Sequence, residues 1–241
     1  MVKVRIGTSG WSYKEWRGIF YPAALKPAEQ LAFYARHLDT TEINNSFYRI
    51  PGEPMVAAWR ERTPDDFLFA RKASRHITHY SKLNDVAESV RLAFDRMRAL
   101  GSKLGPALFQ LPPSLQRDRD LLARFLDVLP PGEHTVEFRH PSWYAPDILD
   151  LLRDHDVALC ISDHRAAPAP WEATAGHVYV RPHGPEANYS GHYDDETLRV
   201  WAGRLAQWRE EGRKIYCYFD NTMKTDAPQD AARLKEQLGT A

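Results

Sequence analysis

Two glutamates, Glu42 and Glu137, are the residues of this sequence best suited to proton transfer. Each stands near the end of a short run of β-branched and apolar residues. Paired carboxyl groups can act as general acid and base when their surroundings hold their pKa values apart. Two further groups in similar positions are expected to assist them. The predicted catalytic residues are Glu42, Glu137, His183 and Asp220.

Three basic side chains, Lys72, Arg139 and Arg181, stand at the ends of comparable runs. Arginine binds carboxylate or phosphate through a planar fork, and lysine supplies a compact point charge. We therefore expect an enzyme of hydrolase or lyase/isomerase type. Its partner should be a small polar or anionic molecule, phosphate-like or sugar-like, with these three residues binding the anion. The other predicted substrate-binding residues are Trp11, Asn44, Gln110, His140, Asp163, Tyr179 and Asn221.

The same charges allow other interpretations. Glu42, Glu137 and Asp220 could instead neutralise the three cations in a structural ion-pair network, because buried charges are costly unless they are paired. No cofactor is predicted. A metal-dependent enzyme that resembles a phosphodiesterase or endonuclease and uses a divalent metal is a less favoured alternative, because oxygen and histidine donors are present but no compact zinc motif exists. The donors would come from Glu42, Glu137, Asp163, His183 and Asp220.

Aromatic and basic residues suggest a second function class, a non-catalytic module that binds a metabolite or nucleic acid. Aromatic side chains crowd the segment from Trp11 to Tyr21, and the segment Arg71 to His76 is the most basic stretch. Most of these aromatics are expected to pack as a lid, with Trp11 as the exception that faces a ligand. Nucleic acid is not favoured, because 32 Lys plus Arg balance 32 Asp plus Glu and non-specific affinity grows with the phosphates neutralised.

The elements that would position these residues are eight short strand-like runs, each followed by a loop and a helix-period segment. This alternation in 241 residues is typical of a TIM-like (β/α)8 barrel, an α/β fold, and we predict one domain over residues 1–241. A doubly wound sheet is the alternative fold, without the glycine-rich turn expected for it. The predicted strands are Val2–Gly7, Thr41–Asn45, Phe67–Lys72, Ala107–Leu111, Thr135–Arg139, Ala158–Ser162, Val178–His183 and Ile215–Asp220.

Residues alternate in these strands between a helix-facing phase and a phase directed toward the barrel axis. The helix-facing phase is apolar, as at Ile43 and Phe138, whereas the axial phase becomes polar toward each carboxyl end. Active sites of such barrels are built at the carboxyl ends of the strands. The candidate residues are therefore expected to meet at one mouth, with Glu42 and Glu137 facing each other across it.

Composition limits where the chain works. No run of about 18 apolar residues and no secretory leader is visible, so no membrane association is expected. Cys160 and Cys217 lie in apolar runs without metal-binding spacing and are predicted to be buried, reduced thiols. A cytoplasmic location follows from that expectation. The sequence does not determine the oligomeric state.

The sequence also resembles the YecE-like family, a domain of unknown function. The resemblance is carried by Gly7-Thr8-Ser9-Gly10-Trp11, by the motif from Glu42 to Tyr48, by Glu137-Phe138-Arg139-His140, and by Tyr218-Phe219-Asp220-Asn221. Asp220 and Thr222 depart from the asparagine-rich pattern expected there. The resemblance spans the chain and implies a TIM-like barrel, but it supplies no reaction.

Overall fold

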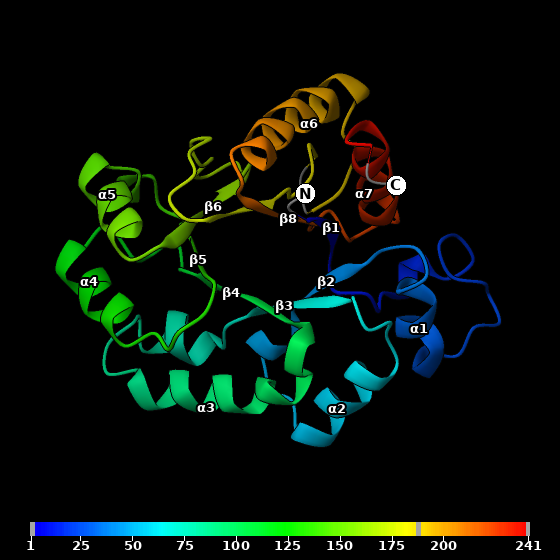
Figure 1. The fold of residues 1–241 in the computed structure, drawn as a ribbon, viewed down its shortest axis with the longest axis horizontal. Helices are drawn as coiled ribbons and strands as arrows, with labels where there is room; N and C mark the ends of the chain where they lie inside the picture. Colours follow the sequence, from blue (N-terminus) through cyan, green and yellow to red (C-terminus); the bar gives the residue numbers. More distant parts are fainter. Residues whose placement is uncertain (1–2, 187–188, 240–241) are drawn as a thin grey trace.

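A computed structural model describes residues 3–186 and 189–239. Its eight strands are parallel and form a closed barrel in sequence order, with the last strand paired to the first. The helices lie around the outside of the barrel (Figure 1), which confirms the TIM-like fold. The strands are β1 Val4–Ser9, β2 Thr40–Ile43, β3 Leu68–Lys72, β4 Leu104–Gln110, β5 His134–Glu137, β6 Val157–Ser162, β7 His177–Arg181 and β8 Lys214–Phe219.

The strand bounds differ from the predicted ones by a few residues at one end or both. Val2, the predicted start of the first strand, lies outside the described residues. Strand β5 ends at Glu137 and β7 at Arg181, so Arg139 and His183 belong to the loops that follow, not to the strands. Because the loops after the strands surround the barrel mouth, both side chains still reach it.

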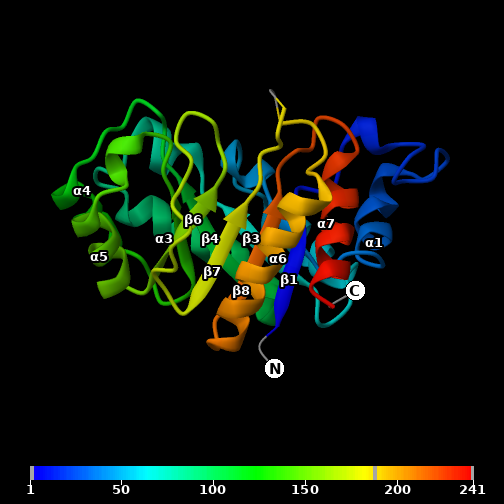
Figure 2. The same ribbon diagram turned by 90° about the horizontal axis from the view of Figure 1, so that it is seen from above.

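Seven α-helices occur in the described chain, and six of them connect consecutive strands. The helices are α1 Gln30–Tyr34, α2 Glu53–Glu61, α3 Ala87–Met97, α4 Arg119–Asp127, α5 Pro146–Asp154, α6 Asp195–Glu210 and α7 Asp226–Gln237. Shorter 3₁₀ or π turns are η1 Lys14–Trp16, η2 Pro27–Glu29, η3 Asn45–Phe47, η4 His76–Tyr80, η5 Arg98–Lys103 and η6 Pro141–Trp143. Figure 2 shows α6 and α7 running alongside β8 and β1.

The prediction that a helix follows every strand is wrong for the connection from β6 to β7. Residues 163–176 are all described and contain no helix. Pro168 and Pro170 interrupt this segment, and proline blocks helix propagation because it lacks an amide hydrogen. Trp171 packs against Trp201 and Trp208 of α6, with ring centroids 5.7 and 6.0 Å apart. A tryptophan thus covers the barrel where a helix was expected.

The two residue phases of the strands lie where the alternation predicts. Outward-facing residues such as Ile43, Phe69 and Phe138 join the apolar layer between strands and helices. A separate, inward cluster fills the inside of the barrel. It comprises Ala70, Leu108, Cys160, Tyr179, Tyr216 and Tyr218. This packed interior fills the barrel below the mouth, so the polar side chains at the strand ends pack against a layer of buried side chains.

Both cysteines are buried free thiols, as predicted. Cys160 belongs to the inward cluster and Cys217 to the outer layer. In the part of the chain that the structure describes, no helix has the length and apolar character needed to cross a membrane.

Candidate active site at the barrel mouth

Arg181, at the end of β7, is the centre of a buried ion-pair network above the barrel interior. Its Nη2 lies 3.0 Å from Glu42 Oε1, and its Nη1 lies 2.9 Å from Asp220 Oδ2 and 3.5 Å from Glu137 Oε2. The Arg181 side chain is 1% exposed, and both glutamates are 0% exposed. Glu42 and Glu137 do meet at the mouth, as expected, but a guanidinium lies between them.

Glu42 is held by several hydrogen-bond donors, and Glu137 is held by ion pairs with two guanidinium groups. Glu42 accepts hydrogen bonds from the Ser9 hydroxyl at 2.8 Å and the Tyr179 hydroxyl at 2.6 Å, in addition to those from Arg181. Glu137 Oε1 lies 2.6 Å from Arg139 Nε. Burial raises the pKa of the Glu137 carboxyl, but the Arg139 and Arg181 guanidiniums outweigh burial and lower it. Glu137 therefore stays ionised at neutral pH.

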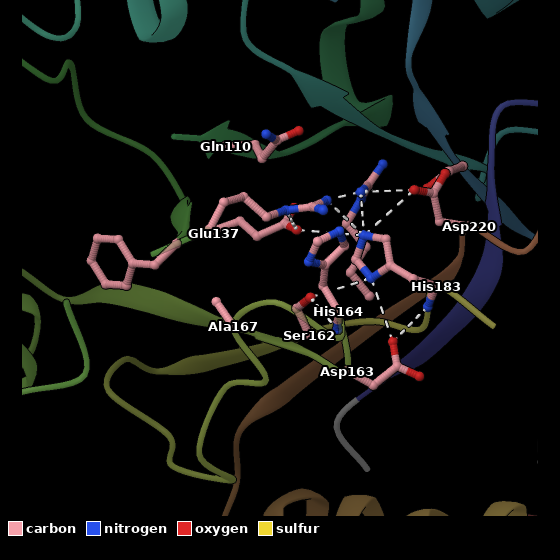
Figure 3. A network of polar contacts seen from close by, with 12 residues as sticks. Gln110, Glu137, Ser162, Asp163, His164, Ala167, His183 and Asp220 are labelled. Atoms are coloured by element: carbon pink, nitrogen blue, oxygen red, sulfur yellow. Dashed lines mark hydrogen bonds and ion pairs between the residues drawn. The ribbon is translucent and has the colours of Figure 1, made fainter. Parts of the chain in front are cut away.

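His183 is neutral in this network. Its Nε2 lies 2.8 Å from Arg139 Nη2 and 2.9 Å from Arg181 Nη1. Because guanidinium nitrogens only donate, Nε2 must accept, which leaves the proton on Nδ1. Burial lowers the pKa of His183 well below its usual value. Figure 3 shows Glu137, Asp220 and Asp163 surrounding this imidazole. The His183 ring therefore lies among charged groups but carries no charge itself.

Four predicted substrate-binding residues lie apart from the central network or at its edge. Asp163 accepts hydrogen bonds from the His183 backbone and from the Tyr193 hydroxyl. Figure 3 shows Gln110 separated from the network, and its amide donates to the carbonyl of the next residue. His140 Nδ1 caps η6 by accepting from the Ser142 amide at 3.2 Å. The Asn221 amide is buried against the Gly191 carbonyl and Asp230.

A cavity of about 600 Å³ opens over the carboxyl ends of β1, β2, β3 and β8. Such a volume lies within the usual range of small-molecule sites. Asn44, Lys72, Asp220 and Trp11, all predicted site residues, line it. Its complete lining is Gly10, Trp11, Ser12, Tyr13, Asn44, Asn45, Phe47, Tyr48, Met55, Trp59, Lys72, Tyr189, Asp220, Thr222 and Met223. Glu42, Glu137 and Arg181 lie beside this lining and are not part of it.

Lys72, at the end of β3, is the exception in the charge arrangement. In the described parts of the chain, no oxygen pairs or hydrogen-bonds with its Nζ, which lies 4.6 Å from the centre of the Phe47 ring. Burial and then the Arg181 guanidinium lower the pKa of Lys72 to about 8, although Glu137 and Asp220 act in the opposite direction. The predicted ion-pair network therefore includes Arg139 and Arg181 but leaves Lys72 at the cavity wall.

Asp220, immediately after β8, belongs both to the network and to the cavity. Burial raises the pKa of its carboxyl, and the Arg181 guanidinium offsets this only in part. Lys72 and Asp220 are the charged residues that line the cavity within residues 3–186 and 189–239. The cavity thus carries one weakly basic amine and one carboxyl group with raised proton affinity.

The aromatic segment after β1 divides into a lid and a cavity wall. Trp16 and Tyr21 are buried, and the Trp16 indole donates to the Lys224 carbonyl at 2.9 Å. Gly10 has a φ of 83°, a left-handed conformation that favours glycine, and the chain turns there toward the cavity. Trp11 then lines the cavity, with its ring centroid 5.4 Å from that of Trp59, edge to face. That Trp11 contacts a ligand stays a prediction.

Several cavity residues were absent from the sequence-based set. Met55 and Trp59 come from α2, Tyr189 comes from the loop after β7, and Thr222 and Met223 come from the loop after β8. Thr222 had a detectable signal, since it departs from the YecE-like pattern. The α2 residues had none, because their helical spacing indicates ordinary packing on the barrel.

The basic segment Arg71–His76 does not form one charged face. The Arg71 guanidinium is buried 4.0 Å from the centre of the Phe94 ring and donates to the Gly105 carbonyl. Arg75 lies over Tyr48 and Tyr80. Adjacent strand residues point to opposite faces, so Arg71 and Lys72 are separated by the sheet.

Among the described residues, no group of three or more His, Cys, Asp or Glu is arranged to hold a metal ion.

Comparison with known proteins identifies the family. The family model "Protein of unknown function DUF72" matches residues 5–241. The chain belongs to the DUF72 family. UPF0759 protein YecE from Escherichia coli K12 is 29% identical over 98% of this chain and 92% of its own length. UPF0759 protein YunF from Bacillus subtilis 168 is 22% identical over 98% of this chain and 94% of its own.

Solved structures agree with this assignment. A DUF72 family protein from Thermotoga maritima superposes with a TM-score of 0.89 at 26% identity, covering 98% of this chain and 99% of that one. A second, from Enterococcus faecalis, has a TM-score of 0.84 at 20% identity over 99% and 96% of the two chains, a similarity of fold. The resemblance to YecE-like proteins is thereby confirmed, and it carries no assigned reaction.

Proposed function

We propose that the protein is an enzyme of lyase, isomerase or hydrolase type that acts on a small polar, negatively charged molecule bound in the cavity at the barrel mouth. The observation that carries this proposal is the Lys72 ammonium, which faces the cavity without an oxygen partner among the described residues. Two other cations at the same mouth, Arg139 and Arg181, are paired with carboxylates.

An unpaired cation in a largely desolvated position is unfavourable unless something compensates it. An anionic or strongly polar oxygen of a ligand would provide that compensation at Lys72. The aromatic walls formed by Trp11, Phe47 and Trp59 would contact the flat or apolar part of the same molecule. Amides and hydroxyls of Asn44 and Thr222 would supply additional polar contacts.

Asp220 is the group proposed to exchange a proton with the bound molecule. Its carboxyl group lines the cavity, and burial raises the pKa of this group toward neutral pH. A pKa closer to neutral pH suits general acid–base chemistry. Glu42 and Glu137, which the sequence predicted to be the general acid and base, have a different role in this proposal. They hold the Arg181 guanidinium, which in turn fixes Asp220, so in this proposal they are positioning residues.

Binding is tested with 3-phenylpropionate, an anion with a flat apolar part, observed by saturation-transfer NMR and calorimetry. We expect Lys72→Met to weaken binding by about ten- to a hundredfold, the usual effect of losing a charge-assisted contact. Lys214→Met is the matched control, because Lys214 pairs with Glu133 at the opposite end of the barrel. Equal affinity in wild type and Lys72→Met, or no binding at all, would refute the proposed site.

Catalysis is tested by solvent deuterium exchange into the carbon next to the carbonyl of phenylpyruvate. Wild type should accelerate exchange over the uncatalysed rate, and Asp220→Asn should reduce the acceleration by about a hundredfold or more, the range of general acid–base contributions. Glu236→Gln, an exposed change on α7, should have no effect. Wild-type exchange at the background rate would contradict the catalytic part of the proposal.

The proposed location is the cytoplasm. Cys160 and Cys217 are buried as free thiols, and reduced cysteines are typical of cytoplasmic proteins.

A further inference from the structure

We propose that Lys72 is a covalent nucleophile that forms an imine with the carbonyl carbon of its substrate, so that the substrate class is an aldehyde or ketone with a flat apolar part. This inference rests on the proposed function, because it uses the same cavity and the same acid–base partner. It adds the identity of the reacting group and the class of molecule on which it acts.

The surroundings of Lys72 differ from those of a structural lysine in the same chain. Lys103 is also buried, but its Nζ donates to the Arg60 carbonyl at 2.6 Å and to the Thr63 carbonyl at 2.7 Å. The Lys72 amine has no such acceptor in the described chain and lies against the face of Phe47. An amine without acceptors keeps its lone pair available once it loses its proton, and it opens onto a cavity large enough for a substrate.

Burial and the Arg181 guanidinium favour the neutral amine of Lys72, and the carboxylates of Glu137, Asp220 and Glu42 oppose them only in part. Arg181 is a second cation close to Lys72, and desolvation beside another cation is a recognised way of activating a lysine nucleophile. In keeping with this geometry, the pKa of Lys72 is lowered to about 8. A measurable fraction of the amine is therefore unprotonated near neutral pH, unlike that of an exposed lysine.

Asp220 on the same cavity supplies the proton transfers that imine formation needs. The Lys72 ammonium first gives its proton to the Asp220 carboxylate. The lone pair of the neutral amine then attacks the carbonyl carbon, and the carbonyl oxygen takes that proton from the Asp220 carboxylic acid. The new ammonium nitrogen returns a proton to Asp220, which then protonates the hydroxyl group. The carbon–oxygen bond breaks, water leaves, and the nitrogen lone pair forms the carbon–nitrogen double bond. One water is released, the product is a protonated imine beside the Asp220 carboxylate, and no oxidant or reductant is consumed.

Reductive trapping tests this assignment. Wild-type protein is incubated at pH 8 with phenylpyruvate or benzaldehyde and sodium cyanoborohydride, and its mass is measured intact and after proteolysis. We expect one adduct whose mass equals that of the probe less one oxygen atom, located on Lys72. Lys72→Arg, which keeps the charge but cannot form this imine, should lose the adduct. Lys214→Arg, the control at the opposite end of the barrel, should keep it.

The possible outcomes separate this inference from the function on which it rests. If 3-phenylpropionate binds and deuterium exchange is accelerated but neither probe labels Lys72, the imine assignment is wrong and the acid–base site stands. An adduct spread over several lysines, or one that persists in Lys72→Arg, likewise overturns it. If binding, exchange and trapping all fail, the proposed function itself is wrong.

Discussion

Arg181 holds Asp220 with its Nη1 2.9 Å from Oδ2, and the same aspartate lines the cavity that Lys72 faces. One carboxyl group thus links the buried ion-pair network to the space where a ligand would bind. The network fixes the position of Asp220, while burial keeps its proton affinity high. The network thus holds in place the carboxyl group that we propose as the proton-transfer residue.

Replacing Arg181 by methionine should destabilise the protein strongly. Glu42 and Glu137 would then remain as buried carboxylates short of positive charge, and breaking a buried pair costs about 3 to 5 kcal/mol. The free energy of unfolding in urea measures the loss. Arg199→Met is the control, because Arg199 and Glu196 are exposed and such pairs contribute about 1 kcal/mol or less. Equal small losses in the two variants would show that the network is not structural.

Two tryptophans of the aromatic segment after β1 should have different roles: Trp16 should contribute to stability and Trp11 to ligand binding. Trp16→Ala removes a fully buried indole and should lower the free energy of unfolding by about 3 to 5 kcal/mol. Trp11→Ala should cost less stability but weaken 3-phenylpropionate binding, because Trp11 lines the cavity. Denaturant unfolding and calorimetry on both variants measure the two effects. Unchanged ligand affinity in Trp11→Ala would remove this residue from the site.

Stability should depend on the ionisation of Lys72 at alkaline pH. The pKa of Lys72 is about 8 in the folded protein and 10.5 for a lysine free of interactions, as in the unfolded chain. Between these two pH values the unfolded chain therefore binds more protons than the folded protein. The contribution of Lys72 to stability therefore rises with pH across this window, by at most about 1.4 kcal/mol per pH unit. Comparing wild type with Lys72→Met in urea from pH 7 to 11 isolates this slope from other titrations. A difference independent of pH would contradict the lowered pKa.

Asp220→Asn should lower the pKa of Lys72 further below 8. The Asp220 carboxylate stabilises the Lys72 ammonium, and removing that charge leaves Arg181 less opposed. The pH dependence of Lys72 acylation, followed by mass spectrometry, reports this pKa. Glu236→Gln on α7 should leave it unchanged. An increase in the Lys72 pKa in Asp220→Asn would mean that the two groups do not interact as described.

Much of this arrangement could be predicted from residue alternation. The placement of Ile43 outside the barrel and Glu42 at its mouth follows from the two-residue period of a strand, and the structure confirms it. The missing helix between β6 and β7 was harder to foresee. Pro168 and Pro170 were visible in the sequence, but the covering role of Trp171 depends on α6, which is distant along the chain.

The distinction between Lys72 and the two arginines could not be predicted. All three are basic residues at or just beyond strand ends, and their types and spacing are equivalent in the sequence. What separates them is whether a carboxylate lies within reach, and that depends on the positions of Glu42 and Glu137 in three dimensions. The contribution of Trp59 to the cavity depends in the same way on how α2 packs against the barrel.

The pH profile of Lys72 reactivity in the wild-type protein tests whether Lys72 carries an activated amine at the barrel mouth. Acetic anhydride labelling at a series of pH values, resolved by peptide mass spectrometry, gives the rate and pKa of each lysine, with exposed Lys224 and buried Lys103 as internal references. We predict that Lys72 reacts readily with a midpoint near pH 8 and that 3-phenylpropionate protects it. A Lys72 that is as unreactive as Lys103, or that titrates near 10.5 like an ordinary lysine, would contradict this prediction.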